Sequence, residues 1–205
     1  MIVLLSGKQG SGKSTIQKVL KQRWEQETKG RAFDINFADV IYEMHNAVLD
    51  ILHKYIPPRP IAKDGKLLQL LGTEWGRDSI SRNLWVDIMK SKIKSLIGPD
   101  PSPVPKIVII GDCRFENEFE AFPGALRVRL TASEEARRKR CSAWRTDTLH
   151  PSELGLDFLE KLNAFDIVID TEKNRVETCV NMIYTALKGR LSERDQALGT
   201  PTPSH

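Results

Sequence analysis

The fold is decided by one stretch of sequence, Gly7-Lys8-Gln9-Gly10-Ser11-Gly12-Lys13-Ser14. It matches the pattern G-x-x-x-x-G-K-[ST] at every fixed position, and it lies between the apolar run Ile2–Ser6 and a segment of helical period. Glycines let such a loop curl with its backbone N–H groups inward, and the helix start adds partial positive charge. We therefore expect a strand, a phosphate-binding loop and a helix in succession. A glycine-rich turn that happens to precede a helix is the alternative.

This loop predicts a nucleoside triphosphate ligand with a divalent metal ion, so the expected cofactors are ATP and Mg²⁺. Lys13 is expected to reach the β- and γ-phosphates, Ser14 to offer its hydroxyl to Mg²⁺, and Thr15 to assist at the α-phosphate. The residues expected to contact the nucleotide are Gly7, Lys8, Gln9, Gly10, Ser11, Gly12, Lys13, Ser14 and Thr15. Motors, switches, ATPases and small kinases share such a loop, so it leaves the reaction open.

Outward from the loop, short aliphatic runs alternate with longer segments of helical period, which predicts an α/β fold with a parallel sheet. The nearly continuous Ile and Val of Lys106–Ile110 indicate a strand buried on both faces, which we place at the centre of the sheet. Strands are expected at Ile2–Ser6, Arg31–Asn36, Lys106–Ile110, Leu126–Leu130 and Asp166–Ile169. Helices are expected at Ala38–Tyr55, at Lys66–Leu71, at Trp75–Ile97 after an interruption at Gly72-Thr73, and in a closing segment from Val176 to Leu187.

Length and composition indicate one compact domain. Of 205 residues, 40% are hydrophobic and 28% charged, which excludes collagen-like and fully disordered chains. The longest aliphatic runs are four residues, far below the roughly 20 of a membrane helix, and no secretory signal is present, so we expect a cytoplasmic protein without a membrane partner. The net charge of +4 is mild, so no nucleic-acid partner is expected. Cys113, Cys141 and Cys179 lack zinc-type spacing and are expected to be reduced thiols.

A second candidate site follows the predicted central strand, in the stretch Gly111-Asp112-Cys113-Arg114. Open α/β sheets bind ligands at the carboxyl ends of their strands. Asp112 is expected to hold Mg²⁺ through water or to orient an acceptor, and Arg114 to clamp a phosphate. The alternative is that Asp112 only caps the helix that carries Phe119.

The segment Leu67–Asp78, followed by Asn83–Val86, resembles the phage-type deoxynucleoside monophosphate kinases, whose pattern is Gln-x-x-Gly-Thr-Glu-x-x-Arg and then Trp-Val. Cys113 departs from the more usual aliphatic residue, and 205 residues are few for this group. The resemblance implies a P-loop kinase sandwich of three layers, with a five-stranded parallel sheet, a helical acceptor-binding insertion and a small lid. The stretches that carry it are the loop, Phe37-Ala38-Asp39 with Tyr42, Gly111–Glu118, His150–Glu153 and Phe165–Asp170.

The resemblance also implies transfer of the γ-phosphoryl group of ATP to a small-molecule partner, the 5′-phosphate of a deoxynucleoside monophosphate. The chemistry agrees, because two polyanions must meet: Lys13 and Mg²⁺ serve the donor, Arg77 and Arg114 the acceptor. No general base is required, since the second pKa of a phosphate monoester is about 6. Trp75 or Trp85 is expected to stack on the acceptor base, with core packing as the alternative. The residues expected at the acceptor are Asp39, Trp75, Arg77, Trp85, Asp112 and Arg114.

A lid is expected at residues 133–155, opened by Ser133 as a helix N-cap and followed by a dense basic run. Arg137 is expected to reach the transferred group when the lid closes, and Arg140 and Arg145 are further candidates. The alternative is a solvated charged face paired with the acidic residues of the same helix. The residues expected to be catalytic are then Lys13, Arg114 and Arg137, and those expected to hold the metal are Ser14 and Asp112.

We expect a single kinase domain at residues 1–190, with the acceptor-binding helices at about 38–97 and a frayed tail at 191–205. The loop Asp170–Asn174 is expected to border the adenine. The phosphate-binding loop, the Asp-x-Arg stretch at 112–114, the lid arginines and the stretch Glu153–Asp157 together also resemble the animal-type phosphomevalonate kinases. A phosphomevalonate kinase is therefore the main alternative function. A nucleotide-binding switch protein without turnover is a third hypothesis. Base preference, ribose selectivity and pairing into a homodimer stay open at this stage.

Overall fold

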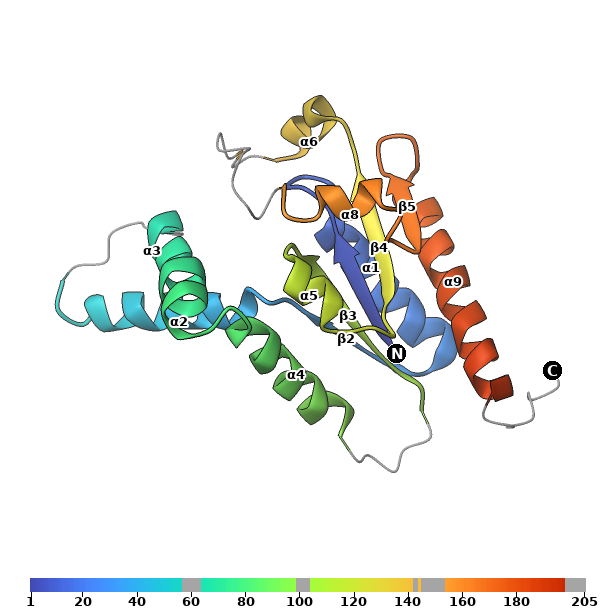
Figure 1. Cartoon of the computed structure of the whole chain (residues 1–205), viewed down its shortest axis with the longest axis horizontal. Coiled ribbons are helices and arrows are strands. Elements are labelled where there is room, and N and C mark those ends of the chain that lie inside the picture. The colour runs from blue at the N-terminus through green and yellow to red at the C-terminus, as the bar shows by residue number, and fades with distance from the viewer. Residues whose placement is uncertain (57–63, 99–103, 142–143, 145–153, 198–205) are drawn as a thin grey trace. The chain divides into compact units, whose positions relative to one another are not determined.

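The computed structural model of the chain describes residues 1–56, 64–98, 104–141, 144 and 154–197. At its centre is a five-stranded parallel sheet with strand order β2-β3-β1-β4-β5 (Figure 1). The strands are β1 Ile2–Ser6, β2 Arg31–Ile35, β3 Lys106–Cys113, β4 Leu126–Thr131 and β5 Ile167–Asp170. The predicted α/β class and its parallel sheet are thus confirmed.

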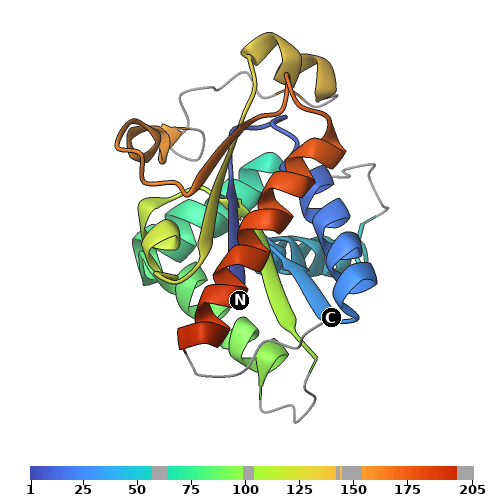
Figure 2. The ribbon, with the colours of Figure 1, turned by 90° about the vertical axis from the view of Figure 1, so that its right-hand side faces the viewer.

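The chain forms two compact units, one of residues 1–34 with 102–205 and the other of residues 35–101. In the first unit, α1 and α9 lie side by side on one face of the sheet and α5 lies on the other, which makes three layers (Figure 2). Its helices are α1 Lys13–Thr28, α5 Glu116–Glu120, α6 Glu134–Arg140, α8 Asp157–Lys161 and α9 Val176–Ala197. The second unit consists of α2 Asp39–Leu52, α3 Gly65–Gln69, the π-helix η1 Leu70–Ile80 and α4 Leu84–Ile97.

Apolar burial on both faces of the sheet stabilises the first unit. Successive strand side chains point to opposite faces, so a continuous apolar run is buried only where both faces are covered. Ile107–Ile110 satisfies this condition, with every side chain 0% exposed. Ile107 and Ile109 join the cluster that contains Leu20 and Trp24 of α1 and Ile183 of α9. The prediction of a strand buried on both faces is confirmed.

The second unit differs from the sequence expectation at Gly72-Thr73, where no helix break occurs. α3 continues into η1 as far as Ile80, and the break falls just before α4. A Cβ on Gly76 would lie 2.4 Å from Cζ2 of Trp85, so this glycine makes room for the indole. The glycines of this segment therefore permit close helix packing instead of ending a helix.

Two further expectations are wrong. The middle strand of the sheet is β1, which lies between β3 and β4, whereas β3 was expected there. A run of Ile and Val indicates that a strand is buried on both faces, but it does not indicate where the strand lies in the order of the sheet. The closing helix continues to Ala197, so residues 191–197 are helical instead of forming a frayed tail. Leu191 packs against the core, and this contact extends the helix past the point where the composition turns polar. Residues 198–205 lie outside the described part of the chain.

Candidate functional site

The phosphate-binding loop joins β1 to α1. Gly12 is the N-cap of α1 with φ of 91°, and Gly10 has φ of 77°, so both adopt backbone conformations that L-residues rarely take. At Gly10 there is also no room for a side chain, because a Cβ would lie 2.6 Å from the carbonyl oxygen of Arg137. These two glycines let the loop turn into α1 while it lies against α6.

Lys13, the first residue of α1, folds back onto the loop. Its Nζ donates to the carbonyl oxygens of Gly7 at 2.5 Å and Lys8 at 2.9 Å, and the residue is only 8% exposed. A buried ammonium group needs such acceptors, because its desolvation is costly. The structure thus holds one positive charge against the loop that would receive the phosphates.

The candidate Mg²⁺ ligands are oxygen donors. Ser14 and Thr15 are exposed in the first turn of α1, and Asp112 is half-buried near the end of β3. Mg²⁺ prefers oxygen and is usually held by one or two protein groups together with substrate phosphates. Within the described residues, no group of three or more His, Cys, Asp or Glu side chains is placed to hold a metal. Ser14 and Asp112 thus offer oxygen atoms of the kind that Mg²⁺ prefers, and their role as its ligands stays a prediction.

Helix α6 lies against the same loop. Its N-cap is Ser133, whose Oγ accepts a hydrogen bond from the backbone N of Ala136 at 3.2 Å. Arg137 is buried, and its Nη1 donates to the carbonyl oxygen of Gln9 at 3.1 Å. Lys139 instead pairs with a glutamate of its own helix in solvent, as the solvated-face alternative predicts. Arg145 and much of the expected lid at 133–155 lie outside the described residues.

A hollow of about 440 Å³, here called the Thr15 hollow, lies at the end of the phosphate-binding loop. It is lined by Gly12 and Thr15, by Arg140 of α6, and by Thr171 and Asn174 of the loop after β5. Arg140 donates to the Oγ1 and the carbonyl oxygen of Thr171, both at 3.0 Å. The loop that was expected to border an adenine thus contributes two residues to a ligand-sized hollow.

The loop after β5 is held in shape by its carboxylates. Asp170 accepts a hydrogen bond from the backbone N of Glu172 at 2.9 Å, and the ammonium of Lys173 lowers the pKa of this carboxyl. Glu172 accepts from the backbone N of Ser133 at 3.0 Å, and hydrogen bonding with the side chain and the backbone of Ser133 lowers the pKa of this carboxyl as well. Both carboxylates are therefore ionised at neutral pH, and Glu172 ties the loop to the start of α6.

A hollow of about 520 Å³, here called the Lys8 hollow, lies at the beginning of the phosphate-binding loop. Lys8 and Arg137 line it, together with Asp157, Glu160 and Lys161 of α8. Arg137 lines the Lys8 hollow and Arg140 lines the Thr15 hollow, so the two candidate lid arginines lie at different hollows. The two hollows therefore flank one loop.

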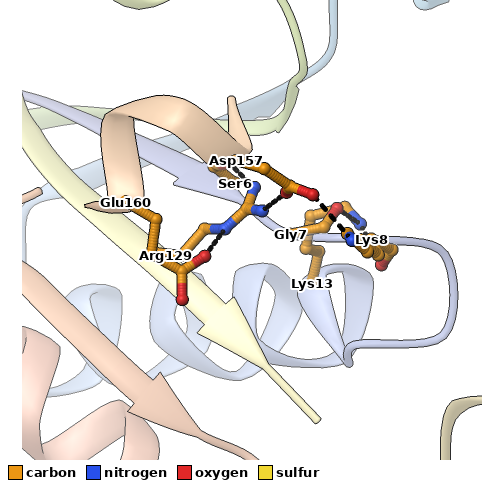
Figure 3. A network of polar contacts seen from close by, with 7 residues as sticks. All are labelled: Ser6, Gly7, Lys8, Lys13, Arg129, Asp157 and Glu160. Atoms are coloured by element: carbon orange, nitrogen blue, oxygen red, sulfur yellow. Dashed lines mark hydrogen bonds and ion pairs between the residues drawn. The ribbon is translucent and has the colours of Figure 1, made fainter. Parts of the chain in front are cut away.

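A buried arginine of β4 organises the Lys8 hollow (Figure 3). The side chain of Arg129 is 5% exposed; its Nε donates to Glu160 at 2.9 Å, its Nη1 to Ser6 Oγ at 2.9 Å, and its Nη2 to Asp157 Oδ1. The other carboxylate oxygen of Asp157 binds Lys8 Nζ at 2.8 Å. Arg129 and Glu160 were not among the residues expected at the site, and Asp157 was named only as the last residue of the stretch Glu153–Asp157. The available signal was a strand, Leu126–Thr131, in which two arginines alternate with apolar residues, because an arginine that is buried there requires carboxylates from elsewhere in the chain.

The segment after β3 shows that Asp112 is not the N-cap of the helix that follows. The N-cap of α5 is Phe115, and Glu118, which is 1% exposed, accepts from the backbone N atoms of Arg114 at 2.8 Å and Phe115 at 3.1 Å. Asp112 lies within β3. The alternative that Asp112 caps this helix is therefore wrong, because Glu118 performs that task.

The remaining expected acceptor residues lie in the second unit. Asp39 starts α2, where it accepts from the backbone N of Asn36 at 2.8 Å. Trp75 is 40% exposed, whereas Trp85 is 1% exposed and donates from Nε1 to the carbonyl oxygen of Gly72 at 2.8 Å. This burial favours core packing for Trp85 and leaves Trp75 as the exposed aromatic. Arg77 lies in η1 and is half-buried. The expectation that Arg77 and Arg114 bind the same acceptor phosphate stays a prediction.

No protein-family profile and no curated protein matches the sequence. Among solved structures, a shikimate kinase from Aquifex aeolicus superposes with a TM-score of 0.52 at 16% identity, over 93% of this chain and 98% of that chain. A protein from Thermus thermophilus gives 0.53 at 16% identity, over 94% and 97%. A shikimate kinase from Acinetobacter baumannii, in complex with shikimate, gives 0.52 at 12% identity, over 92% and 93%.

At these identities the likeness concerns the fold, and this chain has the fold of the small P-loop kinases. The five-stranded parallel sheet and the helices on both of its faces are common to that class. In the described residues, none of the helices combines the length and the apolarity needed to cross a bilayer.

Proposed function

We propose that the chain is an ATP-dependent phosphotransferase that moves the γ-phosphoryl group of ATP to the 5′-phosphate of a deoxynucleoside monophosphate. The observation that carries the proposal is the pair of hollows on one phosphate-binding loop, at Thr15 and at Lys8. A transferase must bring two ligands together at the γ-phosphate, whereas a switch protein needs room for one. Two ligand-sized hollows at the two ends of the loop therefore favour transfer.

In this proposal the nucleotide lies at the Thr15 hollow with its phosphates along the loop. Lys13 neutralises the β- and γ-phosphates, while Ser14 and Asp112 hold Mg²⁺, which supplies charge neutralisation when bound. Arg137, at the Lys8 hollow, faces the end where the γ-phosphoryl leaves. Because the acceptor is itself an ionised phosphate, positioning and positive charge carry the reaction without a general base.

The acceptor class rests on the Gly-Thr-Glu-Trp-Gly-Arg stretch at residues 72–77, which resembles the phage-type deoxynucleoside monophosphate kinases. In the proposal Arg77 and Arg114 clamp the acceptor phosphate, Asp39 contributes to its binding, and Trp75 stacks on its base. Two of the solved structures that share the fold are named as kinases of a small molecule, which supports a small-molecule acceptor here.

The test is ADP release by the purified protein with Mg–ATP and one acceptor at a time: dAMP, dCMP, dGMP, dTMP, mevalonate 5-phosphate or shikimate. Turnover with a deoxynucleoside monophosphate supports the proposal. Turnover with mevalonate 5-phosphate alone assigns the phosphomevalonate alternative, and turnover with shikimate alone assigns a hydroxyl acceptor. ATP binding without acceptor-dependent ADP release would identify a nucleotide-binding switch.

A further inference from the structure

The polar network of Figure 3 links helix α8 to the phosphate-binding loop through one buried charge. Arg129 is on β4, paired in register with Ser6 of β1, so its guanidinium lies where the loop begins. A buried guanidinium is strongly destabilising unless carboxylates and hydrogen bonds compensate it. Asp157 and Glu160 provide that compensation, and both come from α8.

Helix α8 depends on these carboxylates for its place. It has five residues, Asp157–Lys161, and none of them is buried. Asp157 and Glu160 are three residues apart and thus share one face of the helix, which is the face that meets Arg129. The charge contacts, together with the buried Leu156 just before the helix, hold α8 at the Lys8 hollow.

Asp157 has a contact that Glu160 does not share. Its Oδ2 binds Lys8 Nζ at 2.8 Å, while the carbonyl oxygen of the same Lys8 accepts from Lys13 Nζ at 2.9 Å. Lys8 is therefore held at two points: its side chain binds Asp157 of α8, and its backbone carbonyl accepts from Lys13. Asp157 thus reaches the phosphate-binding lysine through a single intervening residue.

The size of the Asp157–Lys8 interaction argues against a purely stabilising role. The two side chains are 30% and 33% exposed, and ion pairs this open to solvent contribute little to the stability of the fold. Arg129, at 5% exposure, already fixes the position of Asp157. The contact with Lys8 therefore adds little stability, but it fixes the direction of a cation at the rim of the hollow.

We propose that Asp157 is a positioning residue for phosphoryl transfer that acts through Lys8. Resting on the function proposed above, the inference is that Asp157 holds the Lys8 ammonium toward the Lys8 hollow, at the end of the phosphate-binding loop where the γ-phosphoryl group would lie. Without this carboxylate, the Lys8 side chain follows the most negative phosphate of bound ATP. It then strengthens ground-state binding instead of serving the transition state.

The experiment compares the full-length chain with Asp157→Asn, Lys8→Met and the double variant. We expect Asp157→Asn to lower kcat about tenfold, within the range for lost positioning, and to tighten Mg–ATP binding about threefold, the scale of one exposed charge pair. In the double variant kcat should match that of Lys8→Met within about twofold, because Asp157 acts through Lys8. Asp157→Glu, which keeps the charge, should recover part of the lost kcat.

Glu160→Gln is the matched control, because it also removes a carboxylate from Arg129 but leaves the Lys8 contact in place. Glu160→Gln should lower Tm about as much as Asp157→Asn does. The factor by which Glu160→Gln changes kcat should be the same in the wild-type protein and in the Lys8→Met variant. If Asp157→Asn lowers kcat by the same factor in both Lys8 backgrounds, its role is structural and the inference is wrong.

The affinity for Mg–ATP, measured by titration calorimetry without acceptor, separates this inference from the proposed function. Turnover with none of the acceptors would remove the proposed function. In that case, an ATP affinity that Asp157→Asn leaves unchanged would contradict the inference as well. If Asp157→Asn changes the ATP affinity and the change is absent in the Lys8→Met background, the coupling between Asp157 and Lys8 is retained as a property of the nucleotide site.

Discussion

A Cβ atom on Gly10 would lie 2.6 Å from the carbonyl oxygen of Arg137, so the phosphate-binding loop and α6 touch through their backbones. Arg137 also returns a hydrogen bond to the loop, from Nη1 to the carbonyl oxygen of Gln9 at 3.1 Å. Helix α6, which follows β4, therefore contacts the phosphate-binding loop, which follows β1, and limits the space at Gly10. This relationship makes the loop sensitive to any side chain at Gly10.

Gly10→Ala is expected to destabilise the fold and weaken ATP binding. A left-handed backbone costs an L-residue about 1–2 kcal/mol, and the new methyl group must also displace α6. Thermal unfolding and titration with Mg–ATP measure the two effects. Gly124→Ala is the control, since nothing lies within 4 Å of its added Cβ. An unchanged Tm and ATP affinity in Gly10→Ala would contradict the described contact.

Lys13→Ala is expected to lower turnover by at least ~10²-fold, the effect of removing one preorganised charge from a transition state. The rate of ADP release with the best acceptor measures it. Lys21→Ala is the control, because Lys21 lies on the same helix but forms an exposed ion pair with Asp34. Equal rates for wild type and Lys13→Ala would remove this residue from the proposed site.

Arg77→Ala is expected to raise the acceptor KM far more than the ATP KM, because the lost contact belongs to the acceptor alone. Steady-state kinetics with each ligand varied in turn measure the two constants. Arg82→Ala removes an exposed cation from the turn after η1 and serves as the control. If both constants rise equally in Arg77→Ala, Arg77 does not contact the acceptor.

The two tryptophans of the second unit are expected to respond differently to substitution. Trp85→Phe removes the hydrogen bond to the carbonyl oxygen of Gly72 and should cost about 1–3 kcal/mol, because a buried carbonyl group loses its partner. Trp75→Ala should change stability little and raise the acceptor KM. Denaturant unfolding and acceptor kinetics of both variants measure these effects. A stable Trp85→Phe variant with weakened acceptor binding would reverse the assignment.

The three cysteines are all free, as the sequence predicts, but they differ in exposure. Burial raises the pKa of the thiols of Cys113 and Cys179, so both stay protonated and unreactive at neutral pH, because the thiolate is the nucleophile. Cys141 is partly exposed at the end of α6. We expect iodoacetamide to modify Cys141 first in the folded protein, with the other two reacting only after unfolding. Mass spectrometry of the digested protein gives the order, and early modification of Cys113 would contradict its burial.

Local patterns account for the parts of the fold and site that the sequence predicted correctly. The strand Ile2–Ser6, the loop after it and the cap at Ser133 each depend on residues within one short segment. The central place given to Lys106–Ile110 was wrong, because strand pairing depends on contacts between segments far apart in the chain. The contact of Arg140 with Thr171 was not predicted for a related reason, since a helix position gives a direction but not the element that lies there.

The amino-acid sequence by itself determined the phosphate-binding loop, the parallel α/β class and the candidate cations, because backbone geometry and hydrophobic period are local properties. Only the tertiary structure decided that two hollows flank the loop, that Arg137 and Arg140 serve different ones, and that Asp157 holds Lys8. The physical reason is that a buried charge such as Arg129 must be compensated, and folding alone selects which distant carboxylates do so.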